Sequence, residues 1–115
     1  MLETNVLEAL VLDTLDDAKA TDICALDVRK LTDITSVMVI CTGNSARHIK
    51  AISSRLIDKV KEHNHRPLGS EGELEGEWIL VDLDDVVVHI MQPKAREFYS
   101  LEKLWSHPAG KVEEE

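Results

Sequence analysis

The chain has 115 residues, with 22 Asp and Glu against 13 Lys and Arg, so its formal net charge is −9. This length predicts a single domain. The acidic balance argues against direct sequence-specific binding of nucleic acid, because phosphates need a basic surface. A basic protein partner would instead be attracted by the field of this chain.

The sequence shows no sign of a membrane or secretory protein. No apolar run reaches the roughly 20 residues that a membrane helix needs, and no signal peptide is visible at the start. Cys24 and Cys41 lie in apolar, strand-like stretches. This placement favours two buried free thiols in a reducing compartment over a disulfide. We therefore expect a cytoplasmic protein with no membrane contact.

The first half of the chain predicts two helices and two strands. Apolar residues at helical spacing predict an amphipathic helix over residues 5–20, and a strand is expected over 23–28. The apolar run 37–41 predicts a strand that is buried on both faces. A second helix follows, and either Asn44 or Ser45 is suited to be its N-cap.

The second half of the chain predicts a hairpin and a last helix. Residues 64–77 contain several Gly and read as a loop with room for a short edge strand. Strands are expected over 78–83 and 86–91, because only Asp84 and Asp85 separate them, which is hairpin spacing. Pro93 suits the first turn of a helix that would run to Trp105.

The order of these elements is helix, two strands, helix, two or three strands, helix. It predicts an α/β (α+β) domain with a mixed β-sheet and helices packed on it. We expect one domain over residues 1–108 and a short, acidic, disordered tail over residues 109–115.

The two faces of the predicted hairpin differ in character. One face is entirely aliphatic and must belong to the core. With a two-residue turn its pairs are Leu83–Val86, Val81–Val88 and Ile79–Ile90. The other face carries Trp78, Leu80 and Asp82 opposite Met91, His89 and Val87. Mixed apolar surfaces of this kind often mark binding sites, with Trp as the anchor. The alternative is that the last helix covers this face.

The predicted last helix holds all the aromatic residues other than Trp78. Phe98, Leu101 and Trp105 fall on one stripe, which is expected to pack on the sheet. Arg96 and Tyr99 lie off that stripe and are available to contact a partner.

Catalytic chemistry has weak support. Asp82, Asp84 and Asp85 resemble a metal-binding carboxylate cluster, and residues 42–45, which open a helix, resemble a phosphate cradle. In a nucleotidyltransferase the carboxylates follow the helix start closely, but here they come roughly forty residues later. A hairpin turn also favours Asp. We therefore interpret the aspartates as turn residues and expect neither a catalytic residue nor a cofactor.

The histidines and cysteines add no site. His63 and His65 stand one residue apart with no other ligand at metal spacing, so we expect both to be solvated and no metal to be bound. Cys41 has no evident base partner.

Five stretches of this sequence occur together in one known family. They are Asp22-Ile23 with Ala25–Val28, Ile40–His48, Glu71-Gly72 with Glu77–Asp82, Asp85–Met91, and Arg96–Trp105. In this order they resemble the ribosomal silencing factors, also called the Iojap-related family. The resemblance covers residues 5–105.

The resemblance implies a nucleotidyltransferase-like fold that is catalytically degenerate, and a translational repressor in place of an enzyme. It implies binding to the large ribosomal subunit through its interface protein conventionally numbered fourteen. Bound there, such a factor blocks joining of the small subunit and silences translation under nutrient limitation. Organelle relatives serve large-subunit assembly. Asp84 departs from the family pattern, because relatives often have Gly there.

The hairpin argument and the resemblance together predict one partner-binding surface. The family's interface carries over to Trp78 and its strand neighbours, and to two residues of the last helix. The predicted partner-binding residues are Trp78, Leu80, Asp82, His89, Met91, Arg96 and Tyr99. Two other hypotheses remain open: a nucleotidyltransferase-like enzyme that uses Asp82, Asp84 and Asp85, and a homo-oligomeric scaffold. Whether the chain is a monomer or a homodimer is open as well.

Overall fold

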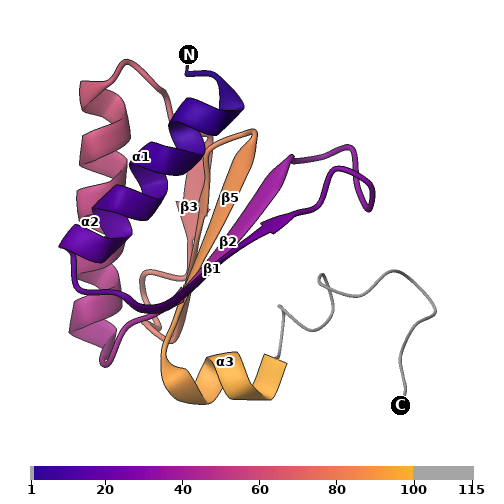
Figure 1. The fold of residues 1–115 in the computed structure, drawn as a ribbon. Helices are drawn as coiled ribbons and strands as arrows, with labels where there is room; N and C mark the ends of the chain where they lie inside the picture. The colour runs from indigo at the N-terminus through magenta and orange to yellow at the C-terminus, as the bar shows by residue number, and fades with distance from the viewer. Residues whose placement is uncertain (1, 100–115) are drawn as a thin grey trace.

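The computed structural model describes residues 2–99, which form a five-stranded mixed sheet with three helices (Figure 1). The helices are α1 (Thr4–Asp17), α2 (Ala46–Glu62) and α3 (Pro93–Tyr99). The strands are β1 (Thr21–Asp27), β2 (Val37–Thr42), β3 (Gly69–Glu71), β4 (Trp78–Asp82) and β5 (Val86–Met91). This confirms the predicted α/β (α+β) class. The rest of the predicted last helix and the predicted tail lie outside the described residues. No helix within 2–99 has the length and apolar character to span a membrane.

The sheet has the order β1-β2-β5-β4-β3. β2 and β5 pair in parallel at its centre, and the other three neighbouring pairs are antiparallel. A parallel pair needs a crossover connection, and α2 with the β3–β4 segment supplies it. β5 therefore lies between β2 and β4, although β4 precedes it in the chain.

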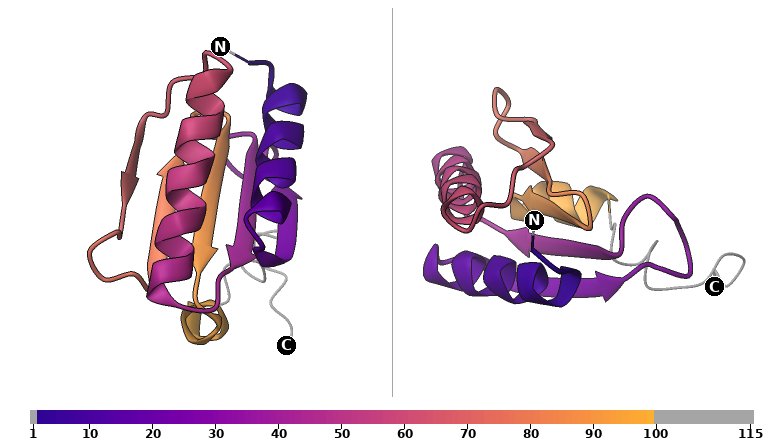
Figure 2. Two further views of the ribbon diagram at one scale, coloured as in Figure 1. Left: turned by 90° about the vertical axis from the view of Figure 1, so that its left-hand side faces the viewer. Right: turned by 90° about the horizontal axis from the view of Figure 1, so that it is seen from above.

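Helices α1 and α2 lie side by side against one face of the sheet (Figure 2). Their apolar stripes and the inward side chains of the sheet make the main core. Its fully buried members from the helices are Leu7, Val11, Leu15, Ile49, Ile52, Leu56 and Val60. The aliphatic face of the β4–β5 hairpin meets these helices, as the sequence predicted. Its six residues, Ile79, Val81, Leu83, Val86, Val88 and Ile90, are fully buried in the same cluster.

The β4–β5 turn has the predicted two-residue length. Trp78 pairs with Met91, Leu80 with His89 and Asp82 with Val87. The Leu83 amide donates to the Val86 carbonyl at 2.9 Å. Asp84 has φ +79°, a left-handed conformation that glycine adopts without strain. This is the geometric reason why a Gly would suit position 84.

The strands near the N-terminus agree with the predictions, apart from their bounds. Every residue of β2 is buried. Cys24 and Cys41 are both free thiols; Cys41 is buried and Cys24 half-buried. The first helix ends at Asp17, three residues before the predicted end, because Lys19 has φ +70° and turns the chain into β1.

Helix α2 begins directly after Gly43-Asn44-Ser45. Ser45 is its N-cap, and its hydroxyl accepts from the amide of His48 at 3.0 Å. Gly43 allows the helix to approach β2, because a Cβ built at this position would lie 2.5 Å from Cγ2 of Ile49 and 3.2 Å from Cδ1 of Ile52. The Cγ2 methyl is attached to the rigid branch of a fully buried side chain. Gly43-Asn44-Ser45 therefore starts α2 and allows it to pack closely at the β2–α2 junction.

Gly43→Ala should lower the free energy of unfolding by about 1–3 kcal/mol, because the added methyl overpacks the junction. Gly69→Ala is the matched control, because a Cβ at Gly69 has no atom within 4 Å. Urea denaturation of both variants tests the expectation. Equal midpoints for the two variants would contradict the packing role of Gly43.

Candidate partner-binding surface

The face of the sheet opposite α1 and α2 is only partly covered. Within residues 2–99 this side carries α3 alone, at the end of β5 (Figure 2). Six side chains of the hairpin strands belong to it, and we call them the open face. They are Trp78, Leu80, Asp82, Val87, His89 and Met91. Trp78, Leu80, Asp82 and Val87 are half-buried, so each keeps surface that a partner can contact.

A hydrogen bond orients the indole of Trp78. Its Nε1–H donates to Nδ1 of His89 at 2.9 Å, and the two ring centroids are 5.7 Å apart. The neutral imidazole of His89 therefore carries its proton on Nε2. The indole also packs against a second apolar cluster, whose buried members are Val28, Met38, Ile40, Met91 and Ala95. A Trp that is held in one orientation loses little side-chain entropy when a partner binds.

His89 and Met91 lie beneath the surface instead of on it. His89 is 6% exposed and Met91 fully buried. The prediction that they belong to the site needs a correction on this point, because a partner on the rigid surface would touch neither. Strand alternation gave the correct face, but alternation cannot show how far the neighbouring Trp78 and α3 cover these two side chains. Their role is to support Trp78.

The carboxylate of Asp82 also takes part in the hairpin turn. Oδ1 accepts from the backbone amide of Asp84 at 2.9 Å. The backbone carbonyl of Asp82 accepts from the backbone amide of Leu68. The side chain is half-buried. Asp82 therefore combines a turn-forming role with a negative charge at the edge of the open face.

Arg96 joins α3 to the sheet. Its guanidinium donates to the carbonyl of Asp22 and to Oγ1 of Thr42, the latter at 2.8 Å. These bonds connect the last helix to the start of β1 and the end of β2. The guanidinium of Arg96 is therefore a tertiary contact; the side chain is half-buried, and its contact with a partner stays a prediction. The side chain of Tyr99 is outside the described part of the structure.

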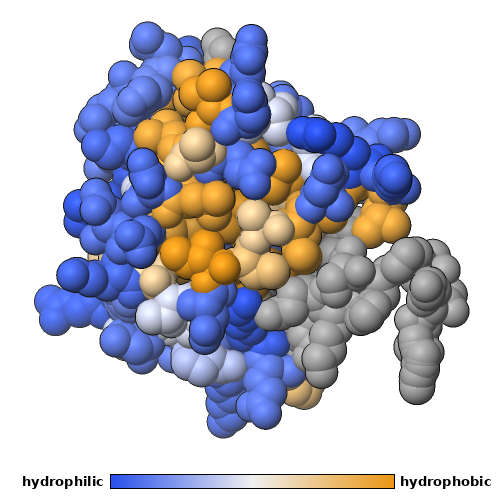
Figure 3. Space-filling model, in the orientation of Figure 1, coloured by the Kyte–Doolittle hydropathy of each residue, from blue (hydrophilic) through white to orange (hydrophobic). Residues whose placement is uncertain are grey.

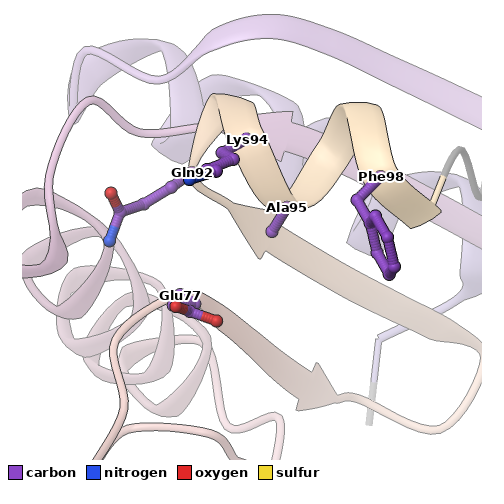
Figure 4. A pocket seen from close by; sticks show the side chains of 5 residues that line it. All are labelled: Glu77, Gln92, Lys94, Ala95 and Phe98. Atoms are coloured by element: carbon purple, nitrogen blue, oxygen red, sulfur yellow. The ribbon is translucent and has the colours of Figure 1, made fainter.

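Phe98 does not follow the predicted packing stripe. It is 80% exposed, and the other two members of that stripe, Leu101 and Trp105, lie outside the described residues. Phe98 borders a hollow of about 290 Å³ between α3 and the start of β4 (Figure 4). The hollow is lined by Glu77, Gln92, Lys94, Ala95 and Phe98.

The groups that resembled a catalytic site have structural roles. Asp84 occupies the hairpin turn, and Oδ2 of Asp85 accepts from the hydroxyl of Thr4 at 2.9 Å. Across residues 2–99, no three His, Cys, Asp or Glu side chains group in a way that could hold a metal ion. Burial raises the pKa of Cys41 to about 12, although the nearby charge of Arg96 acts in the opposite direction. Cys41 is therefore a neutral thiol near pH 7.

Two histidines have structural roles that sequence reasoning missed. His48 accepts from the amide of Asn44 through Nδ1 and contacts the carbonyl of Ala18 through Nε2, both at 3.0 Å. The prediction that His65 is solvated is wrong, because it is 3% exposed and bridges Leu2 and Leu83. The local signal for His48 was its position four residues after Asn44 at a helix start. His65 had none, because its partners are distant in sequence.

A separate apolar surface follows α1 and the edge strand β1. Figure 3 shows apolar side chains across the middle of this side of the molecule, bordered by hydrophilic ones. Ile23, Cys24 and Leu26 of β1 are half-buried; Ile23 packs on the main core and Leu26 on the second apolar cluster, so the apolar side chains lie on both faces of this edge. Val6 of α1 is exposed. An edge strand with apolar side chains is a possible template for pairing with another chain.

The stability of the domain should fall between pH 6.5 and 4 because of His89. Burial lowers its pKa from 6.5 to about 4, so the unfolded chain takes up this proton over that range while the folded chain does not. The contribution lost is up to roughly 3 kcal/mol. His89→Gln, which retains an acceptor for Trp78, should remove this component. Urea titrations at several pH values test it, with the exposed His63→Gln as control; identical pH profiles for the wild type and His89→Gln would disprove it.

Comparison with known proteins identifies the family. The family model described as "Ribosomal silencing factor during starvation" matches residues 3–115. The chain is similar to the ribosomal silencing factor RsfS of Haemophilus influenzae, with 46% identity over 87% of this chain and 98% of the relative. Mouse "Mitochondrial assembly of ribosomal large subunit protein 1" is 34% identical over 84% of this chain and 44% of its own length.

Solved structures agree with the sequence comparisons. The crystal structure of a Chromobacterium violaceum protein has a TM-score of 0.89 and 41% identity, over 96% of this chain and 94% of that one. A second crystal structure, from Bacillus halodurans, has a TM-score of 0.80 and 35% identity, over 88% and 94% of the two chains. The fold and the sequence thus lead to the same assignment: this chain belongs to the ribosomal silencing factor family.

Proposed function

We propose that this protein represses translation in the cytoplasm by binding the large ribosomal subunit through its interface protein numbered fourteen, so that the small subunit cannot join. The observation that carries the proposal is the open face. Its largest apolar side chain, Trp78, is oriented by His89 and remains half-buried at the surface. A rigid Trp with accessible surface is the type of residue that dominates protein–protein binding energies.

Electrostatics support a ribosomal protein as the partner. The chain has a net charge of −9, and Asp82 places a carboxylate at the end of the open face away from Trp78. Ribosomal proteins are commonly basic, because they bind RNA phosphates. Such a partner would be attracted at a distance by the acidic field and held at close range by apolar contact.

The proposed mechanism is occlusion, which needs no chemical step. A domain of this size that is bound at the subunit interface prevents joining by excluded volume. The turn roles of Asp84 and Asp85 and the neutral Cys41 thiol agree with this mechanism. The family name connects the chain to silencing of ribosomes, and we extend that to a direct block of joining.

The protein should co-sediment with isolated large subunits and bind joined ribosomes much less. Trp78→Ala should weaken large-subunit binding by roughly 2 kcal/mol, about thirty-fold, because it removes the largest apolar side chain of the open face. Val6→Ala is the control, because Val6 is an exposed apolar residue on α1, in the opposite layer.

The same variants need a urea unfolding curve, because Trp78 also packs on the second apolar cluster. A variant that is less stable but binds with wild-type affinity would exclude the open face as the interface. Equal wild-type binding to large subunits and to joined ribosomes would rule out occlusion.

Association with the large subunit should slow as salt rises, while dissociation changes little, because salt screens charges and leaves apolar burial intact. Asp82→Asn should slow association at low salt; the Asn side chain can still accept from the amide of Asp84. Asp13→Asn makes the same charge change on an exposed position of α1 and should have a smaller effect. Stopped-flow kinetics at several salt concentrations decide this. Equal effects of the two variants would mean that Asp82 is not close to the partner.

Self-association is a second candidate function, which the apolar edge at β1 favours. A second copy of the chain could extend the sheet there, and symmetric pairing of one surface is common among homodimers. Sedimentation velocity over a hundredfold concentration range separates the two hypotheses. A single monomeric species throughout would remove self-association.

A further inference from the structure

The hollow between α3 and the start of β4 is lined by apolar side chains on one side and by a carboxylate on the other. Ala95 and Phe98 extend from α3 toward it, and Glu77 lies across from them, just before β4 (Figure 4). Apolar surface thus faces a carboxylate across a single small space. Lys94 lies on the helix side of the hollow, across from Glu77.

The hollow has a fixed frame. The side-chain amide of Gln92 donates to the carbonyl of Gly76 at 2.7 Å, and its backbone amide donates to the carbonyl of Glu77 at 2.9 Å. Ala95 packs on the fully buried Met91. These contacts hold the Glu77 segment against the first turn of α3, so the hollow is preformed.

The volume of about 290 Å³ lies just below the usual range for sites that take a drug-sized ligand. One long side chain is a better match in size than a cofactor. The same hollow adjoins the open face, because Glu77 directly precedes Trp78 and Met91 packs in one cluster with both Ala95 and Trp78. A protein that covers Trp78 would therefore also reach the hollow.

We propose that this hollow receives one arginine side chain of the ribosomal partner. The inference rests on the function proposed above and adds the chemistry of a specific contact. A guanidinium can pair with the Glu77 carboxylate, while its flat face and methylene stem pack against Phe98 and Ala95. A lysine ammonium lacks the flat face that can stack on Phe98, and a purely apolar side chain offers no charge to pair with Glu77.

The first test uses small probes and the full chain, without ribosomes. In an NMR titration, N-acetyl-arginine amide should shift the signals of Glu77, Ala95 and Phe98, and the lysine and norleucine amides should shift them less. Glu77→Gln retains the shape of the hollow and should abolish the preference for arginine. Glu71→Gln is the matched control, on an exposed position of β3. Equal shifts with the norleucine or lysine amide would overturn the arginine assignment.

The second test measures binding to isolated large subunits. Glu77→Gln and Phe98→Ala should each weaken it about tenfold, while Glu71→Gln should bind as the wild type does. Wild-type binding with no loss in either hollow variant would overturn the proposed contact and leave the proposed function standing. If the wild type fails to bind large subunits, the proposed function falls, and the NMR titration alone then decides whether the hollow takes a guanidinium.

Discussion

The parallel pairing of β2 with β5 is the constraint on which the rest of the domain depends. Both strands lie at the centre of the sheet, and all of β2 and all but one residue of β5 are buried. Their register, from Val37 opposite Val86 to Thr42 opposite Met91, joins two segments that are far apart in the sequence. The connection between them must cross the sheet, and α2 does so while burying its apolar stripe. The close approach of α2 at Gly43 follows from the same connection.

Helices α1 and α2 cover only one face of the buried central strands, so the opposite face must be covered by other side chains. The second apolar cluster covers it with few residues. Trp78 and α3 shield Met91, while Arg96 ties α3 to the ends of β1 and β2. This cover is incomplete, so Trp78 both covers the core and remains partly exposed at the surface. Trp78 is thus held in place on the open face by the same contacts through which it covers the centre of the sheet.

The residues that looked chemical share one explanation. Each makes a contact or lies in an environment that contributes to folding. His48 fastens the start of α2 to the end of α1, and His65 bridges the N-terminus and the hairpin. Burial maintains Cys41 as a neutral thiol. The stretch 40–48 therefore contains a folding motif at the β2–α2 junction, and the proposed binding surface lies on other strands.

Local patterns determined much of this fold. Helical spacing, strand alternation and the Asp84–Asp85 turn were sufficient to predict the elements, the hairpin register and the face of Trp78, because each depends on residues that are close in the chain. The resemblance of five stretches indicated the family, and the acidic charge indicated a basic partner. The end of α1 could not be predicted, because it depends on a left-handed residue at Lys19.

Only the tertiary structure decided which residues of the predicted surface are accessible. His89 and Met91 are covered by Trp78 and α3, and Arg96 bonds to β1 and β2 residues that lie more than fifty positions earlier. The hollow at Glu77 forms between two segments that only the hairpin pairing brings together. Exposure depends on what long-range packing places over a side chain, and neither periodicity nor composition carries that information.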